Sequence, residues 1–324
     1  MAAANSIPNK HRHPRPRASP AARLDLKIGF ACNNHCLFCA QGDKRSRLAN
    51  KPWGEIIAEL EKAATAGVRG VVFTGGEPTL HPQLTRSVAA ARALGYTKIQ
   101  IQTNGRRFAY RDYCETLAAA GANEFSPSLH GADPETHDTL TRSPGAWRQV
   151  VAGLKNLKRL GLRVFTNTVV VRDNYKDLPK LARLLVDLRV DQFQFAFVHI
   201  VGSAARHRTR IVPRKHAAVP FMLQGLDIGR RAGIACFTEA VPLCLLPGRE
   251  DYAAERMIPD GPVVDAGIRL ESWRHYRTTQ GKAKRPACRT CRHDADCEGP
   301  WREYPKLYGW KEFIPVRLPG DTRA

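Results

Sequence analysis

The chain has 324 residues, of which 43% are hydrophobic and 25% are charged, and its formal net charge is +21. This composition is ordinary for a globular protein, and no apolar stretch approaches the roughly 20 residues that a membrane-spanning helix needs. We therefore expect a cytoplasmic protein without a membrane partner. The positive charge favours anionic partners such as RNA, but no nucleic-acid-binding module is visible, so we favour a solvated basic surface as its interpretation.

Residues 1–23 are rich in arginine and proline, contain no acidic residue and lack the apolar core of a signal peptide. We expect them to form a disordered basic tail, because the prolines would break an amphipathic helix.

From residue 24 onward, strand and helix patterns alternate along the chain. Strands are predicted over residues 24–30, 70–73, 98–102, 123–129, 163–171 and 191–200. Helices are predicted over residues 53–66, 81–94, 112–120, 147–160, 177–188 and 216–231. Such alternation implies an α/β fold with a parallel sheet of right-handed βαβ units, in which functional residues collect at the carboxyl ends of the strands.

After residue 235 the alternation stops, and proline, glycine and cysteine become frequent. We therefore predict a core domain over residues 24–235 and a small cysteine-rich domain over residues 236–324.

Cysteine usage indicates metal binding in a reducing compartment. There are nine cysteines, at positions 32, 36, 39, 114, 236, 244, 288, 291 and 297. An odd number without a secretion signal argues against a disulfide framework, whereas two tight groups are typical of metal sites. Cys114 falls on the apolar face of a predicted helix and is interpreted as a core residue.

The first group, Cys32, Cys36 and Cys39, has the spacing CxxxCxxC and directly follows the first predicted strand. Three thiolates can ligate three irons of a cubane cluster and leave the fourth iron open to a substrate or cofactor. A zinc site would need a fourth ligand, and His35 is poorly spaced for a closed tetrahedron.

A glycine-rich turn, Gly75-Gly76-Glu77-Pro78, follows the second predicted strand. Two glycines let the backbone approach a ligand closely and permit positive φ angles. The backbone carbonyls of such a turn can accept hydrogen bonds from an ammonium group.

These two motifs together, with Phe38 directly before the third cysteine, resemble the radical S-adenosylmethionine (SAM) superfamily. The resemblance implies a partial (βα)6 TIM-like barrel, a 4Fe–4S cluster on the three cysteines, and SAM bound to its open iron. It places the amino group of SAM at Gly75, Gly76, Glu77 and Pro78.

Other positions resemble the family more weakly. Thr103, in Thr-Asn-Gly after the third strand, is similar to a segment of molybdenum-cofactor-type and peptide-modifying members, where it would face substrate. Ser128, in Ser-Leu-His-Gly after the fourth strand, corresponds to a serine that approaches SAM. His130 replaces the family's aspartate there; it is either a catalytic residue or a polar residue at a strand end. Asn174 is either a SAM contact or a simple turn residue.

The second group comprises Cys288, Cys291 and Cys297, with Cys244 upstream as the preferred fourth ligand and Cys236 as its competitor. On spacing alone, zinc and a second 4Fe–4S cluster fit equally well. The stretch resembles the middle of the SPASM pattern, but Trp301 stands where that pattern has a further cysteine. A single auxiliary cluster of the shorter Twitch type is therefore the interpretation.

The resemblance implies an oxidoreductase- or maturase-type enzyme that cleaves SAM reductively to a 5′-deoxyadenosyl radical and abstracts hydrogen from a substrate. The expected substrate is a peptide or protein side chain; the alternatives are a small metabolite in cofactor biosynthesis, or RNA. A flavodoxin- or ferredoxin-like electron donor is the expected partner. A non-catalytic electron carrier is disfavoured by the open-iron triad and the glycine-rich turn.

Overall fold

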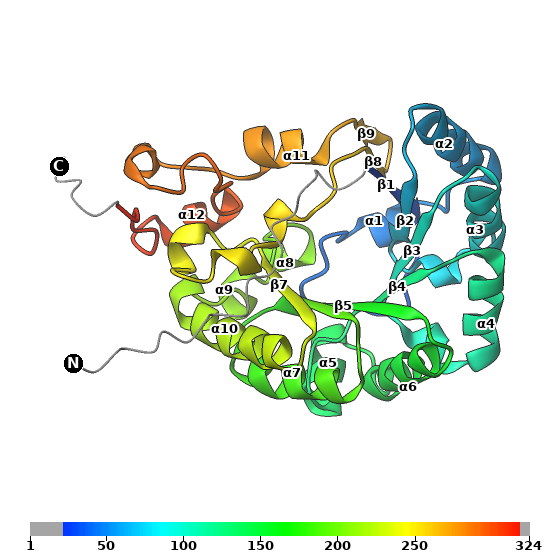
Figure 1. The fold of residues 1–324 in the computed structure, drawn as a ribbon, viewed down its shortest axis with the longest axis horizontal. Coiled ribbons are helices and arrows are strands. Elements are labelled where there is room, and N and C mark those ends of the chain that lie inside the picture. Colours follow the sequence, from blue (N-terminus) through cyan, green and yellow to red (C-terminus); the bar gives the residue numbers. More distant parts are fainter. Residues whose placement is uncertain (1–21, 318–324) are drawn as a thin grey trace, which may run out of the picture.

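The computed structural model describes residues 22–317. Its centre is a curved nine-stranded sheet with the strand order β7-β6-β5-β4-β3-β2-β1-β8-β9 (Figure 1). The strands span Arg23–Gly29 (β1), Gly70–Gly75 (β2), Lys98–Thr103 (β3), Glu124–Pro127 (β4), Arg163–Val170 (β5), Gln192–Phe197 (β6), Ala235–Glu239 (β7), Val263–Asp265 (β8) and Ile268–Leu270 (β9). Strands β1 to β7 pair in parallel and in chain order, which confirms the partial TIM-like barrel.

Six longer helices cover the outer face of the sheet (Figure 1). They are α2 (Trp53–Thr65), α3 (Leu84–Ala93), α4 (Arg111–Ala120), α6 (Ala146–Arg159), α7 (Leu178–Asp187) and α10 (Lys215–Arg231). Each buries an apolar stripe against the strands; in α7, Leu178, Leu181 and Leu185 are almost fully buried at helical spacing. The predicted helices therefore all form, with bounds that shift by a few residues.

Short helices occupy the loops at the carboxyl ends of the strands and the C-terminal segment. They are α1 (Lys44–Arg47), α5 (Pro134–Thr141), α8 (Ser203–Arg206), α9 (Arg208–Ile211), α11 (Trp273–Tyr276) and α12 (Glu303–Tyr308). Helix α5 was not predicted, although Asp133 caps it by accepting a hydrogen bond from the Thr136 amide at 2.8 Å and Pro134 occupies its first turn.

The sheet extends beyond the six predicted strands. Strand β7 adds in parallel to β6, β8 adds in parallel to β1, and β9 pairs antiparallel with β8. Strands β8 and β9 have three residues each, too short for a periodic signal. The boundary predicted between residues 235 and 236 falls inside β7, so a cut there would divide a strand of the main sheet.

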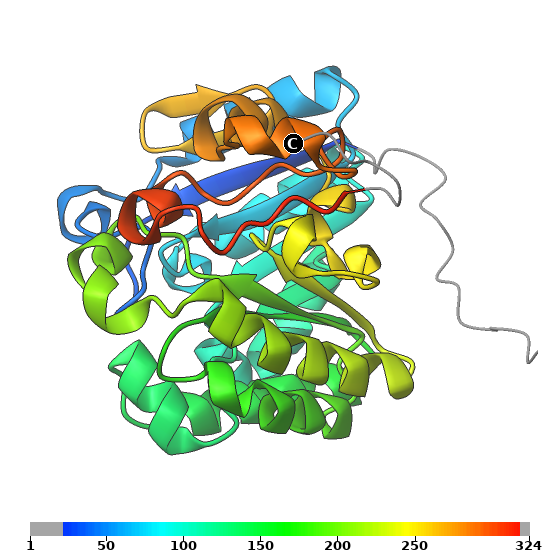
Figure 2. The same ribbon diagram turned by 90° about the vertical axis from the view of Figure 1, so that its left-hand side faces the viewer.

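The segment after β9 runs back over the open side of the barrel towards α9 and α10 (Figures 1 and 2). Tyr304 of α12 secures it there: its ring packs against Phe197 at the end of β6, and its hydroxyl accepts a hydrogen bond from the Lys215 amide at 2.7 Å. The C-terminal segment is therefore anchored at the end of β6 and the start of α10.

Residue Arg23 begins β1, so the predicted tail of residues 1–23 overlaps the sheet by one residue; apart from residues 22 and 23 it lies outside the described residues. Within residues 22–317, no helix has both the length and the apolar character needed to cross a membrane.

Candidate functional site

The loop that follows β1 carries Cys32, Cys36 and Cys39, all three partly buried and none in a disulfide. Burial raises the pKa of the Cys36 thiol, and the neighbouring Cys32 and Cys39 raise it further. The Cys32 sulfur accepts a hydrogen bond from the Asn34 amide at 3.4 Å. The loop therefore carries three neighbouring thiols at the carboxyl end of β1.

Two short helices hold this loop by backbone hydrogen bonds. The end of α5 accepts bonds from the loop: the His35 amide donates to the Thr141 carbonyl at 2.8 Å, and the Leu37 amide to the Leu140 carbonyl at 3.1 Å. On the other side, the Ser203 amide at the start of α8 donates to the Cys39 carbonyl at 2.8 Å. The cysteine loop is therefore fixed to α5 and to α8.

A polar network links the loop to the end of β3. The Asn104 amide side chain donates to the Asn33 side-chain oxygen at 2.6 Å and lies 3.9 Å from the Cys32 sulfur. The Arg106 guanidinium donates to the Asn33 carbonyl at 2.6 Å and to the Asn34 side chain at 3.1 Å. Our sequence analysis missed these residues, because the bonds join positions some seventy residues apart and only Thr-Asn-Gly hinted at one of them.

Glu77 lies at the centre of the adjoining turn and is 3% exposed. Its Oε1 accepts hydrogen bonds from the Thr79 amide (2.9 Å), the Thr79 hydroxyl (2.6 Å) and the Thr103 hydroxyl (2.7 Å), and its Oε2 from the Asn104 amide (2.6 Å). Burial raises the pKa of Glu77, and these hydrogen bonds oppose that rise. The carboxylate thereby joins the end of β2 to the end of β3. The Thr103 hydroxyl donates to Glu77, and a contact of Thr103 with substrate stays a prediction.

The two glycines of this turn are required by the chain's own backbone. A Cβ atom on Gly76 would lie 2.1 Å from the Phe30 carbonyl oxygen, and one on Gly75, whose φ is +142°, would lie 2.0 Å from the Gly29 carbonyl oxygen. The close approach that the sequence attributed to a ligand is thus, first of all, an approach of β2 to the residues that precede Cys32.

The other candidate site residues of the core domain form a buried cluster next to the cysteine loop. The Phe38 ring meets the His130 ring edge-on at 4.7 Å, and the His130 Nδ1 accepts a hydrogen bond from the Val169 amide at 3.2 Å. Burial holds the pKa of His130 well below its usual value, which favours the neutral ring. The Asn174 amide bonds only backbone groups, among them the His130 carbonyl at 2.9 Å.

Ser128 is partly buried, and its backbone forms a parallel β-bridge with Asn167 of β5. The structure therefore brings Phe38, Ser128, His130 and Asn174 together beside the cysteine loop. Their direct contacts are with the protein itself, so their roles towards a cofactor stay predictions.

The C-terminal cysteines also gather at one place. Cys244, Cys288, Cys291 and Cys297 line a single, almost wholly apolar cavity together with Trp310 and Phe313. Burial raises the pKa of Cys244 to about 12, and the other three cysteines raise it further. Cys236 lies elsewhere: it is buried in β7 against α10, and its thiol donates to the Leu226 carbonyl at 3.1 Å. Cys114 is buried in α4, as expected of a core residue.

Both thiol groups have the donor chemistry that an iron–sulfur cluster requires, and the first offers three sulfurs from one loop. Within residues 22–317, no three His, Cys, Asp or Glu side chains are grouped as they would be around one metal ion.

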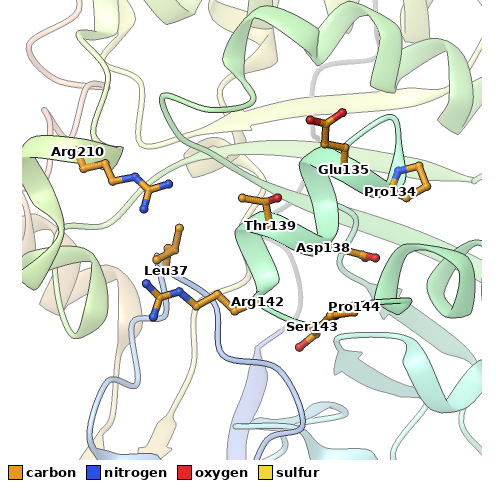
Figure 3. A pocket seen from close by; sticks show the side chains of 9 residues that line it. All are labelled: Leu37, Pro134, Glu135, Asp138, Thr139, Arg142, Ser143, Pro144 and Arg210. Carbon is orange, nitrogen blue, oxygen red and sulfur yellow. The ribbon is translucent and has the colours of Figure 1, made fainter.

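Beside the first loop lies an open hollow of about 630 Å³, lined in part by Leu37, Arg142 and Arg210 (Figure 3).

Comparison with known proteins agrees with this geometry. Residues 26–185 match the model of the radical SAM superfamily. The chain is 32% identical over 186 residues to a probable GTP 3',8-cyclase of Saccharolobus solfataricus, and 34% identical over 167 residues to one of Methanopyrus kandleri. These matches cover 56% and 50% of this chain and 59% and 52% of the relatives, so the chain spans little more than half the length of the relatives it matches.

Among solved structures, SuiB of Streptococcus suis bound to S-adenosylmethionine superposes with a TM-score of 0.66 at 18% identity, covering 93% of this chain and 77% of SuiB. A radical SAM methyltransferase from Sphaerobacter thermophilus superposes with a TM-score of 0.51 at 20% identity, covering 66% and 64% of the two chains. At these identities the likeness concerns the fold. On the match of residues 26–185, this chain carries a radical SAM superfamily domain, and membership of that superfamily implies a 4Fe–4S cluster and SAM.

Proposed function

We propose that this enzyme cleaves SAM reductively at a 4Fe–4S cluster held by Cys32, Cys36 and Cys39, and that its substrate is a peptide or protein side chain. The observation that carries the proposal is the loop of three thiols at the carboxyl end of β1, joined by Glu77 and Asn104 to the ends of β2 and β3. When bound, the cluster and SAM supply a 5′-deoxyadenosyl radical that abstracts a substrate hydrogen.

The chain's own residues prepare this site in two ways. Burial raises the pKa of the Cys32 thiol, and the hydrogen bond that the Asn34 amide donates to its sulfur opposes that rise and so favours the thiolate that iron requires. The Gly76 carbonyl oxygen accepts no hydrogen bond from any group within residues 22–317, and is thereby available to an ammonium group such as that of SAM.

A second 4Fe–4S cluster at Cys244, Cys288, Cys291 and Cys297 is also part of the proposal. The four thiols that line one cavity would supply the four donors of a closed cluster, and Cys236 lies outside that cavity. Since β7 belongs to the main sheet, we place the start of this auxiliary part after Glu239. Structural zinc is the rival occupant, because it accepts the same four donors.

The peptide substrate is supported by the extent of the structural likeness. SuiB has been crystallised with its precursor peptide, and its fold resembles this chain through the C-terminal segment as well as the core. A second candidate is a purine nucleotide, favoured by the GTP 3',8-cyclase relatives. That similarity reaches little more than half of this chain, whereas the likeness to SuiB covers 93% of it.

Replacing Cys32, Cys36 and Cys39 together with alanine should abolish formation of 5′-deoxyadenosine, because no thiolate remains to hold the cluster that reduces SAM. The product is measured by liquid chromatography after anaerobic reconstitution and reduction with dithionite. Cys114→Ala is the matched control, since this buried thiol lies in α4, and it should retain turnover. Undiminished SAM cleavage in the triple variant would refute the assignment.

Reconstituted protein should hold about eight irons, as two cubane clusters require, and Cys288→Ala/Cys291→Ala/Cys297→Ala should hold about four. This variant should still cleave SAM without coupling to substrate, because SAM binds at the first cluster alone. Elemental analysis makes the measurement, with Cys236→Ala as the control that keeps both clusters. About one zinc per chain that survives anaerobic iron–sulfide reconstitution would instead establish a structural zinc site.

Glu77→Gln should destabilise the protein by about 1–3 kcal/mol, because an amide NH₂ group would face N–H and hydroxyl donors in a buried site. Iron retention should fall with it, since Asn104 would lose its anchor beside Cys32. Unfolding midpoints and iron per chain are the measurements. The same substitution at the exposed Glu115 of α4 should change neither, and equal behaviour of the two variants would mean that Glu77 does not organise the site.

A further inference from the structure

The hollow beside the cysteine loop has a distinctive lining. Leu37, which stands between Cys36 and Cys39, forms part of its wall, and the Arg142 and Arg210 side chains reach towards Leu37 from two sides (Figure 3). Arg142 and Arg210 are exposed. Two solvent-accessible guanidinium groups thus flank the surface of the loop that carries the first thiols.

These arginines lie at or next to the helices that hold the loop. Arg142 ends α5, whose Leu140 and Thr141 carbonyls bond the loop backbone. Arg210 lies in α9, which follows α8, whose first amide bonds the Cys39 carbonyl. Anything that docks on both arginines is therefore held directly against the cysteine loop.

Positive charge on this face is incompletely neutralised. Within residues 22–317, Arg142 forms no ion pair, and the Arg210 guanidinium lies 3.5 Å from a single carboxylate, that of Asp173. Nearby, Arg45 donates to His35 and Arg208 donates to a backbone carbonyl, while Arg206 pairs with Asp43 at 2.7 Å.

The two carboxylates that line the hollow, Glu135 and Asp138, point away from the two arginines (Figure 3). The carboxylate oxygens of Asp138 accept hydrogen bonds from the Gly145 and Trp147 amides, both at 2.7 Å. The side of the hollow next to the cysteines is therefore electropositive.

We propose that this face, centred on Leu37, Arg142 and Arg210, is the docking site of a small acidic protein that delivers one electron to the enzyme; the inference rests on the proposed function above. A reduced flavin or iron–sulfur carrier loses one electron, the cluster at the cysteine loop gains it, and no bond or proton need move. Electron transfer weakens steeply with distance, so such a carrier must dock close to the loop. Complementary charge speeds and orients that encounter.

The test compares two reductants in the reconstituted holoenzyme. In Arg142→Glu/Arg210→Glu, formation of 5′-deoxyadenosine driven by flavodoxin, kept reduced by NADPH and its reductase, should fall by about ten-fold or more. Formation driven by dithionite, which needs no protein docking, should stay within about two-fold of the unaltered enzyme. Rising salt should slow the flavodoxin-driven reaction of the unaltered enzyme and affect the variant less.

Two control variants test whether the effect depends on where the charge is changed and on the sign of the charge. Arg159→Glu/Arg231→Glu makes the same change of net charge at the exposed ends of α6 and α10, which precede the amino ends of β5 and β7, and should leave both reactions intact. Arg142→Lys/Arg210→Lys keeps the charge and should retain most of the flavodoxin-driven rate.

Three outcomes would overturn the proposal. Equal flavodoxin-driven rates in the two glutamate variants would show that this face has no special part in reduction. Loss of affinity for a single-stranded RNA oligonucleotide with unchanged flavodoxin-driven turnover would make the face an RNA-binding surface. Loss of the dithionite-driven reaction in Arg142→Glu/Arg210→Glu alone would make the arginines part of the site itself. Absence of 5′-deoxyadenosine in the unaltered enzyme with dithionite would remove the proposed function as well.

Discussion

The buried carboxylate of Glu77 sets the geometry on which the rest of the site depends. It gathers hydrogen bonds from Thr79, Thr103 and Asn104, and so locks the turn after β2 to the turn after β3. Asn104 then carries that constraint to Asn33 and to the sulfur of Cys32. A buried carboxylate is costly unless its acceptor sites are filled, which is why one residue can hold several loops in a single arrangement.

Much of the fold could be predicted because its elements are long and periodic. The strands of the barrel read as apolar runs and the helices as apolar stripes, and both patterns depend only on neighbours in the sequence. Strands β8 and β9 could not be found in this way, since three residues carry no period. Helix α5 had a usable signal in Asp133 and Pro134, and it supplies one of the arginines beside the cysteine loop.

In the candidate site, too, local sequence patterns could be predicted, whereas contacts between distant residues could not. Cysteine spacing and the glycine-rich turn are local patterns, and both lead to the carboxyl ends of β1 and β2. The partners of Glu77 could not be read from the sequence, because Thr103 and Asn104 meet it only after β2 and β3 pair. Likewise, the reason for Gly76 lies in the Phe30 carbonyl, which the sequence alone does not place beside it.

The basic residues are not all at the solvated surface that the composition indicates. Residues 206–215 are a basic stretch, with Arg206, Arg208, Arg210, Arg214 and Lys215, and would be solvated if the positive charge were all at the surface. Yet Lys215 is 1% exposed, donates to the Ala240 carbonyl at 2.7 Å and lies 3.3 Å from the centre of the Phe197 ring. Its burial lowers its pKa well below the usual value. Part of this stretch therefore joins α10 to the ends of β6 and β7, while Arg210 lies at the mouth of the hollow.

The central claim is that the first cysteine loop holds a cluster with one iron open to SAM. Electron paramagnetic resonance of the reduced protein tests it most directly, in the variant that lacks Cys288, Cys291 and Cys297 and so retains only the first cluster. Addition of SAM should change the g values of the reduced cluster, because the amino and carboxylate groups of SAM would ligate the open iron. A spectrum that SAM leaves unchanged would contradict the account.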